Sequence, residues 1–196
     1  MQYLKNAVKE RGKKLVEKLE WVEGAKNYVK YAGIQKGEEV LVLAPTDADP
    51  RIVETVAMAA KDMGATVFVS YMSLPDLPFS QPPRGLAEAI KAVDAVLDLG
   101  VSIVGHSRAF MTAMIEYRTR GVILATSSPE VLKCPAARFP LELQFEIGRR
   151  VFEQVGRGKE IRVTDPRGGE VRAKIHLDSL CGNAGGMKPG PAEPGD

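Results

Sequence analysis

Apolar positions recur at two different spacings along the chain, and the spacing changes near Gly158. Before that residue, short apolar runs alternate with segments in which apolar residues recur every three or four positions, as in amphipathic helices. After it, apolar and polar residues alternate one by one, as in half-exposed strands. The pattern predicts a domain of helices and strands, followed by a smaller β element.

Four apolar runs predict buried strands, and helical segments separate them. The runs are EEVLVLAP, TVFVSYMS, DAVLDLG and VILATSS, which end at Pro45, Ser73, Gly100 and Ser128. In the first helix between them, Asp49 is the expected N-cap, Pro50 occupies the first turn and Gly64 closes the helix. This alternation predicts parallel strands joined by right-handed crossovers. We therefore expect an α/β fold, a doubly wound parallel sheet with helices on both faces, followed by a small β-hairpin subdomain.

Further elements flank this predicted sheet. Amphipathic helices are expected over residues 4–20 and 23–34, and DPRGG between two alternating runs predicts a hairpin after Gly158. The last fifteen residues contain five glycines and three prolines, which is typical of a loop, linker or disordered tail. The expected organisation is N-terminal helices at 1–34, a Rossmann-like α/β domain at 35–157, a β-hairpin subdomain at 158–181 and a Gly/Pro-rich loop or linker at 182–196.

Composition and charge narrow the function classes. The 27 basic and 25 acidic residues give a formal net charge of +2, which produces no overall field for nucleic acid. No run approaches the roughly 18 apolar residues of a membrane span, and the charged N-terminus is unlike a secretory signal. Cys134 and Cys181 match no metal-binding pattern and suit a reducing compartment. We expect a cytoplasmic protein that binds neither nucleic acid nor membrane.

The sequence lacks the common cofactor and catalytic motifs at the positions where they would be expected. The turn after the first strand reads APTDADP, without the glycines that let a backbone approach pyrophosphate, and Asp47 and Asp49 would repel a phosphate there. GHSRA lacks the second glycine of a nucleophile elbow. The two histidines, His106 and His176, do not have metal-site spacing, and alternation makes His176 a half-exposed strand residue.

The stretch VSIVGHSRAF carries the strongest candidate for chemistry. It puts His106 where an apolar run ends and a helix begins, and open α/β sheets bind ligands beyond such strand ends. A histidine there can exchange protons near neutral pH, or it can cap the helix or bond a loop carbonyl. Ser107 has the same two interpretations. We expect His106 at the carboxyl end of the sheet, facing a cleft that a second domain or subunit completes, and Ser107 at the start of the next helix.

Three segments together resemble one group of enzymes. They are GIQKGEEVLVLAPTDADPRIVETVAMAAKDMGA (33–65), HSRAFMTAMIEYRTRGVILATSSPEVL (106–132) and GKEIRVTDPRGGEV (158–171). They are similar to the first strand and helix, the His-Ser turn and the hairpin of the aminopeptidase T family of thermophilic metalloaminopeptidases. That group includes the iron-dependent 2,5-dihydroxypyridine 5,6-dioxygenases, and the His-Ser turn fits the dioxygenases better. The resemblance covers nearly the whole chain.

The resemblance implies that the chain is the N-terminal, substrate-covering domain of a metal-dependent, ring-cleaving dioxygenase. The alternatives are the same domain of a metalloaminopeptidase, which is a hydrolase, or a non-catalytic binding or assembly module. In the group, the metal ligands lie in a C-terminal domain beyond the end of this sequence. A full-length relative is therefore expected to hold a divalent metal, either iron or zinc or cobalt, whereas this chain alone is expected to bind no metal and to be inactive.

The resemblance also implies roles for residues at the predicted site. His106 would be catalytic, as an acid, a base or an orienting group, and Ser107, Arg108 and Thr46 would bind the substrate. That substrate would be a small molecule, either a hydroxylated aromatic ring or a peptide N-terminus. A homo-oligomer is expected.

Overall fold

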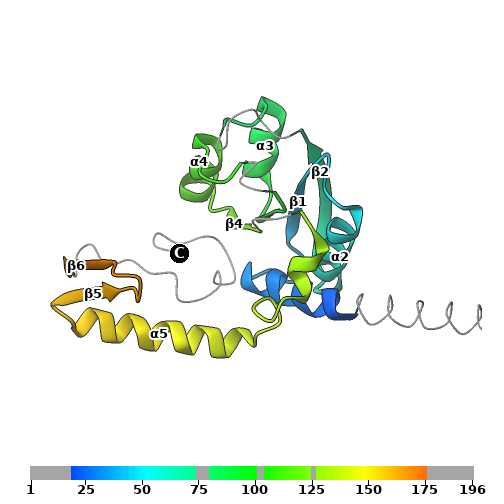
Figure 1. Cartoon of the computed structure of the whole chain (residues 1–196). Coiled ribbons are helices and arrows are strands. Elements are labelled where there is room, and N and C mark those ends of the chain that lie inside the picture. Colours follow the sequence, from blue (N-terminus) through cyan, green and yellow to red (C-terminus); the bar gives the residue numbers. More distant parts are fainter. Residues whose placement is uncertain (1–18, 74–79, 101–103, 125–126, 176–196) are drawn as a thin grey trace, which may run out of the picture. The chain divides into compact units, whose positions relative to one another are not determined.

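The computed structural model describes residues 19–73, 80–100, 104–124 and 127–175. The described residues divide into two compact units, one ending at Phe139 and the other beginning at Pro140. The first unit contains a four-stranded sheet with helices, and the second contains one long helix and a two-stranded sheet (Figure 1). Most of the helix predicted over residues 4–20, and the loop predicted over 182–196, lie outside the described residues.

The four-stranded sheet is parallel throughout, as the sequence predicts. Its strands are β1 (Glu39–Pro45), β2 (Thr66–Met72), β3 (Ala95–Asp98) and β4 (Arg120–Ile123). The strand order is β2-β1-β3-β4, so Leu43 of β1 lies opposite Ser70 of β2 on one side and opposite Asp98 of β3 on the other. The chain passes from β1 to β2 on one side and then crosses to β3 and β4 on the other side of β1, so the doubly wound fold is confirmed.

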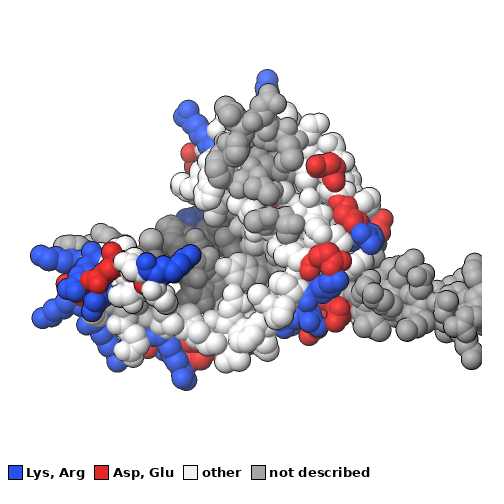
Figure 2. Space-filling view, in the orientation of Figure 1, with Lys and Arg blue, Asp and Glu red and all other residues white. Residues whose placement is uncertain are grey.

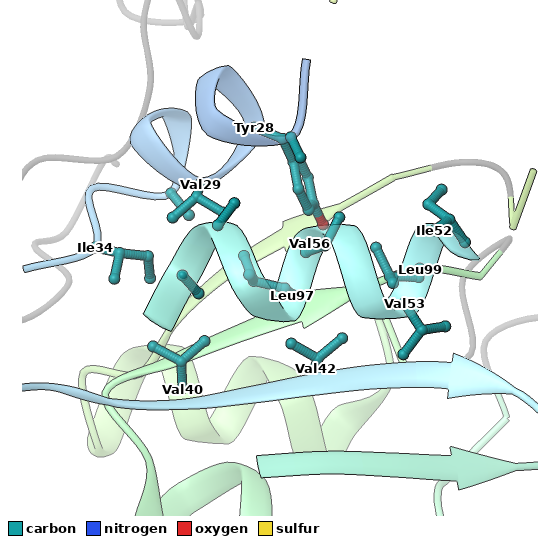
Figure 3. Close-up of a cluster of buried hydrophobic side chains, with 14 of the residues drawn as sticks. Tyr28, Val29, Ile34, Val40, Val42, Ile52, Val53, Val56, Leu97 and Leu99 are labelled. Carbon is teal, nitrogen blue, oxygen red and sulfur yellow. The ribbon is translucent and has the colours of Figure 1, made fainter. Parts of the chain in front are cut away.

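Helices cover both faces of this sheet. The helix over residues 19–31 and α2 (Pro50–Asp62) pack on one face, and α3 (Arg84–Ala92) and α4 (Arg108–Glu116) pack on the other. Alternation along β1 produces the two cores: Val40 and Val42 belong to the first, and Leu41 and Leu43 to the second. Figure 3 shows Val40 and Val42 pointing from the strand toward α2.

The ends of α2 follow the chemistry predicted from the sequence. The Asp49 side chain caps the helix by accepting a hydrogen bond from the Arg51 backbone N–H (2.9 Å), and Pro50 takes the first position. Gly64 follows the C-cap with φ +90, a left-handed conformation that glycine adopts without strain.

Several predicted boundaries are wrong. Residues 19–31 form one helix, where a break was expected between residues 20 and 23. The fourth strand was predicted over VILATSS, but β4 ends at Ile123, and the 3₁₀ helix η1 (Pro129–Lys133) begins after Ser128. The Ser128 Oγ accepts a hydrogen bond from the Glu130 N–H (3.4 Å), so this serine caps a helix instead of extending a strand.

β4 also begins earlier than predicted, at a fully buried arginine. The Arg120 guanidinium donates to the carbonyl of Ala32, at 3.1 Å, and to that of Gly33. Its Nη2 lies 2.5 Å from a Glu38 carboxylate oxygen. Nη2 and Nε have no well-aligned hydrogen-bond partner, so the Glu38 contact is an ion pair rather than a bidentate hydrogen bond. Long-range partners therefore allow a charge inside the strand.

The second unit contains α5 (Leu141–Arg157) and the predicted hairpin, β5 (Glu160–Thr164) with β6 (Glu170–Lys174). The Asp165 N–H donates to the Gly169 carbonyl (2.8 Å), and the Gly168 N–H donates to the Asp165 carbonyl (2.9 Å). Gly168 has φ +98, which explains glycine at this position of the turn. In the described part of both units, no helix is long and apolar enough to cross a membrane.

Candidate functional site

The carboxyl ends of β1 and β3 lie side by side in the middle of the parallel sheet. The Leu99 N–H, just after β3, donates to the carbonyl of Leu43 in β1 (2.8 Å). The connections that follow these strands depart in opposite directions, toward β2 and toward β4. Open α/β sheets bind ligands outside the strand ends at such a switch point. Thr46 follows β1 here, and His106 belongs to the connection that follows β3.

His106 occupies a tight turn with a strained backbone. The Ser107 N–H closes the turn by donating to the Val104 carbonyl (2.9 Å), and His106 between them is exposed, with φ +63. A left-handed conformation costs a non-glycine residue about 1–2 kcal/mol. Gly105 before it packs closely on the end of β4, because a Cβ there would lie 2.1 Å from Cδ1 of Ile123. The turn is held against the sheet and presents a histidine at its surface.

Ser107 is the N-cap of α4, as one of its two interpretations predicts. Its Oγ accepts a hydrogen bond from the Phe110 N–H (3.2 Å), its carbonyl accepts one from the Met111 N–H (2.9 Å), and only 1% of the residue is exposed. Arg108 is exposed as the first residue of α4. Gln81 covers the next amide, because its Oε1 accepts from the Ala109 N–H (3.1 Å). The helix start is therefore hydrogen-bonded and the Arg108 side chain is accessible.

The loop after β1 forms the other side of this edge. Thr46 is exposed, and its N–H donates to the carbonyl of Met72 at the end of β2 (3.1 Å). The Asp49 N–H donates to the Ser127 carbonyl (3.3 Å), which joins this loop to the segment after β4. Hydrogen bonds from Arg51 hold the pKa of the Asp49 carboxyl down at about 2. An ionised carboxylate thus occupies the start of α2, the place where a dinucleotide-binding fold holds its phosphate.

Asp98 is a polar residue of this edge that the sequence analysis missed. It ends β3, is 1% exposed, and accepts the Gly100 N–H at Oδ1 (3.0 Å) and the Val104 N–H at Oδ2 (3.3 Å). The Tyr28 hydroxyl lies 3.4 Å from the Asp98 carbonyl and donates to the Val122 carbonyl at 2.8 Å. Burial, and secondarily the Asp98 charge, raise the pKa of Tyr28 well above its ordinary value, so this phenol stays protonated. The signal in the sequence was an aspartate inside the apolar run AVLDLG.

The predicted site residues lie on two loops at one end of the sheet. Thr46 is in the loop after β1, His106 and Ser107 are in the connection between β3 and α4, and Arg108 begins α4. His176 lies outside the described residues. Among the residues that the structure describes, no three His, Cys, Asp or Glu side chains are grouped to hold a metal ion.

A separate surface groove lies between the helix over 19–31 and α2. Trp21, Val22 and Met58 supply its apolar lining, and Lys26 and Asp62 form an ion pair of 2.9 Å along it. It is built by helices on one face of the sheet and not by the loops that follow the strands. It lacks a histidine or cysteine, so the sheet edge is the better candidate for proton transfer.

Known proteins match the chain by family and by fold. The family described as 2,5-dihydroxypyridine 5,6-dioxygenase matches residues 20–193. The structure of 2,5-dihydroxypyridine dioxygenase from Pseudomonas putida KT2440 superposes with a TM-score of 0.59 at 19% identity, over 80% of this chain and 47% of that one. The chain thus spans about half the length of that enzyme, and identity this low supports the fold alone.

A second structural match is more distant. Ureidoglycine–glyoxylate aminotransferase from Bacillus subtilis superposes with a TM-score of 0.35 at 14% identity, over 57% of this chain and 30% of that one. No curated protein matches the chain by sequence.

Proposed function

Because the chain belongs to the 2,5-dihydroxypyridine 5,6-dioxygenase family, we propose that it forms the substrate-covering part of a ring-cleaving dioxygenase. Its ligand would be a hydroxylated, pyridine-like aromatic ring. The P. putida enzyme is about twice as long as the region that this chain matches, so the proposal concerns a part of the enzyme and not the complete catalytic centre.

The observation that carries this proposal is the placement of His106 in a strained turn at the switch point of the sheet. Strained backbone that the surrounding structure maintains is found preferentially at functional sites. Histidine is also the side chain best suited to move a proton near neutral pH. In our proposal, its imidazole accepts or orients the proton of a ring hydroxyl.

Two further residues at this edge suit a hydroxylated ring. Thr46 offers a hydroxyl from the loop after β1, and Arg108 offers a positive charge from the start of α4; both are exposed. A guanidinium would stabilise an oxygen that becomes negative when the ring loses its proton. The Ser107 hydroxyl is already engaged in capping α4, so we assign Ser107 to holding the turn beside the ligand.

The proposed roles of His106, Thr46 and Arg108 do not involve a metal. The resemblance implies a divalent metal in full-length relatives, but no group of ligands is found among the described residues. The described residues therefore do not fit a metal site, and we derive no step through a metal. Their proposed work is to bind the ring, orient it and handle its proton.

A binding experiment on this chain tests the proposal directly. 2,5-dihydroxypyridine is added to ¹⁵N-labelled protein, with unsubstituted pyridine as the control ligand. We expect saturable shifts of the Thr46, His106 and Arg108 amides with the hydroxylated ring only, and weaker binding to His106→Gln. Shifts confined to the groove around Trp21 and Met58, or equal shifts with pyridine, would contradict it. In a full-length family member, replacing the histidine that aligns with His106 by alanine should lower turnover by roughly 100-fold or more, with folding unchanged.

The two alternatives make different predictions in the same experiments. An aminopeptidase-like domain would respond to a leucine dipeptide and not to the ring. A binding or assembly module would respond to neither, and it would instead form an oligomer of defined size in sedimentation. The observation that favours the module is the exposed apolar face of the hairpin, where Val163 and Val171 are 55% and 62% exposed. Exposed apolar patches of this kind mark protein interaction sites.

A further inference from the structure

Asp98 is a buried carboxylate fixed from both sides by the sheet. Its carbonyl accepts the Leu124 N–H after β4 (2.8 Å), and the next residue, Leu99, donates to Leu43 of β1 (2.8 Å). Alternation puts its side chain on the same face as Val96, which packs with the α3 and α4 core. A buried carboxylate is costly unless hydrogen bonds compensate it. The partners of its two oxygens therefore reveal why it is tolerated here.

Those partners lead directly to the histidine turn. One carboxylate oxygen accepts the Gly100 N–H (3.0 Å), immediately after the strand. The other accepts the N–H of Val104 (3.3 Å), the first residue of the turn, and the Val104 carbonyl accepts the Ser107 N–H that closes it (2.9 Å). Val104 thus links the Asp98 side chain to the turn. Its N–H binds Asp98 at the start of the turn, and its carbonyl binds Ser107 at the end.

The turn needs such a restraint, because His106 is held at φ +63 against an intrinsic cost of about 1–2 kcal/mol. Gly105 packs on Ile123 and Ser107 caps α4, which hold the middle and the exit of the turn. Asp98 holds its entrance. We infer that Asp98 is a positioning residue, which keeps His106 in its left-handed conformation at the sheet edge by binding the Val104 amide.

The choice of residue agrees with this role. An ionised carboxylate only accepts hydrogen bonds, so both of its oxygens can receive backbone N–H groups. Asparagine has nearly the same shape but would turn an NH₂ group toward one of these two donors. Asp98→Asn therefore changes the hydrogen bonding of Gly100 and Val104 with little change in volume. The part that His106 plays in proton transfer rests on the proposed function, whereas its positioning by Asp98 does not.

Hydrogen exchange and NMR of this chain test the inference. We compare the wild type with Asp98→Asn and with Asp94→Asn, a control at the opposite end of β3, where the Asp94 carboxylate accepts the Glu39 N–H (2.8 Å). The ring signals of His106 are assigned with His106→Gln. Asp98→Asn should speed exchange of the Val104 amide at least tenfold and shift or broaden the His106 ring signals. Asp94→Asn should speed exchange at Glu39 and leave His106 unchanged.

Two results would overturn the inference. One is a Val104 amide that already exchanges freely in the wild type, a measurement that stands even if Asp98→Asn does not fold. The other is faster exchange at Val104 in Asp98→Asn with unchanged His106 signals, since Asp98 would then stabilise the connection without positioning the histidine.

Turnover separates this inference from the proposed function. In a full-length family member, the substitution equivalent to Asp98→Asn should lower kcat at least tenfold with KM within about twofold, because the ligand still binds but its proton-handling group is displaced. Normal turnover after His106→Ala, together with displaced His106 signals in Asp98→Asn, would refute the proposed function and keep the positioning role. Normal kcat in the Asp98→Asn enzyme, where His106→Ala is inactive, would refute the positioning role alone.

Discussion

The two sheets of this protein are stabilised in different ways. Every residue of β3, and all of β1 except its first, is buried between two layers of helices, whereas all ten residues of β5 and β6 are exposed. The parallel sheet is held by burial of apolar surface. The hairpin is held by its turn and its ladder, because its ion pairs, such as Arg162 with Glu170 at 2.8 Å, are exposed and contribute little. Figure 2 shows many Lys and Arg side chains, with acidic ones among them, on the part formed by the hairpin.

The hairpin nevertheless has the alternation of a sheet with a core. Val163 and Val171 are cross-strand partners on one face, and the pair Arg162 and Arg172 lies on the other. The helix of the same unit also leaves apolar residues exposed, including Ile147 and Val151. Among the described residues, the same binary pattern therefore gives a closed core in one unit and an open apolar face in the other.

The largest effect is expected from a cavity in the first unit. Leu97 is fully buried in the cluster that contains Trp21, and Leu97→Ala should lower the free energy of unfolding by about 3–5 kcal/mol. Urea unfolding followed by fluorescence of Trp21, the single tryptophan, measures this loss. The matched change Val163→Ala should alter the same transition by less than about 0.5 kcal/mol. Equal losses would show that the two sheets do not differ as described.

The next effect concerns arginines in the two units. Arg120→Met leaves the Glu38 carboxylate and the Ala32 carbonyl without their buried partner, and should cost about 2–4 kcal/mol in the same urea experiment. On α5, Arg149 contacts Glu146 at 2.9 Å and also Glu153, but its side chain is 54% exposed. Arg149→Met should leave the free energy of unfolding of the first unit unchanged in that experiment, because exposed ion pairs contribute little. A larger shift from Arg149→Met than from Arg120→Met would reverse this assignment.

A glycine in each unit separates packing from backbone strain. A Cβ at Gly121 in β4 would lie 1.9 Å from Cζ of Phe110, whereas one at Gly168 would contact nothing within 4 Å, although φ there is +98. Gly121→Ala should destabilise the first unit by about 1–3 kcal/mol, and Gly168→Ala should destabilise the hairpin alone by about 1 kcal/mol. Hydrogen exchange of amides in β1 and β5 distinguishes them. Loss of protection in β1 after Gly168→Ala would contradict the prediction.

The smallest effect is a pH dependence. Hydrogen bonds from Arg51 lower the Asp49 pKa to about 2, so its capping contribution is complete above the unfolded value near 4 and is lost as the pH falls toward 2. Asp49→Ala should therefore cost about 1 kcal/mol at pH 6 and distinctly less at pH 2.

The control is Glu146 in the second unit, where Arg149 and Arg150 also lower the Glu146 pKa to about 2. Glu146→Gln should nevertheless leave the Trp21 transition unchanged at both pH values, since α5 belongs to the other unit. A constant cost of Asp49→Ala from pH 6 to pH 2 would contradict the charged cap.

The sequence by itself determined the local elements of this protein. The N-cap Asp49, the αL position of Gly64 and the turn around Gly168 act within a few residues, and the apolar runs specify which segments can be buried. These signals predicted the strands and helices of the α/β sheet, the hairpin and the start of a helix at Ser107. They worked because each depends on neighbours that the sequence places together.

The tertiary structure alone decided which strands are neighbours and which polar groups are buried. The order β2-β1-β3-β4 brings Thr46 and the His106 turn to one edge of the sheet. Pairing with Ala32 and Glu38 draws Arg120 into β4, and the amides of Gly100 and Val104 make Asp98 tolerable inside. The local sequence could not predict the burial of Arg120 and Asp98, because the cost of burying a charge depends on partners that only the folded chain supplies.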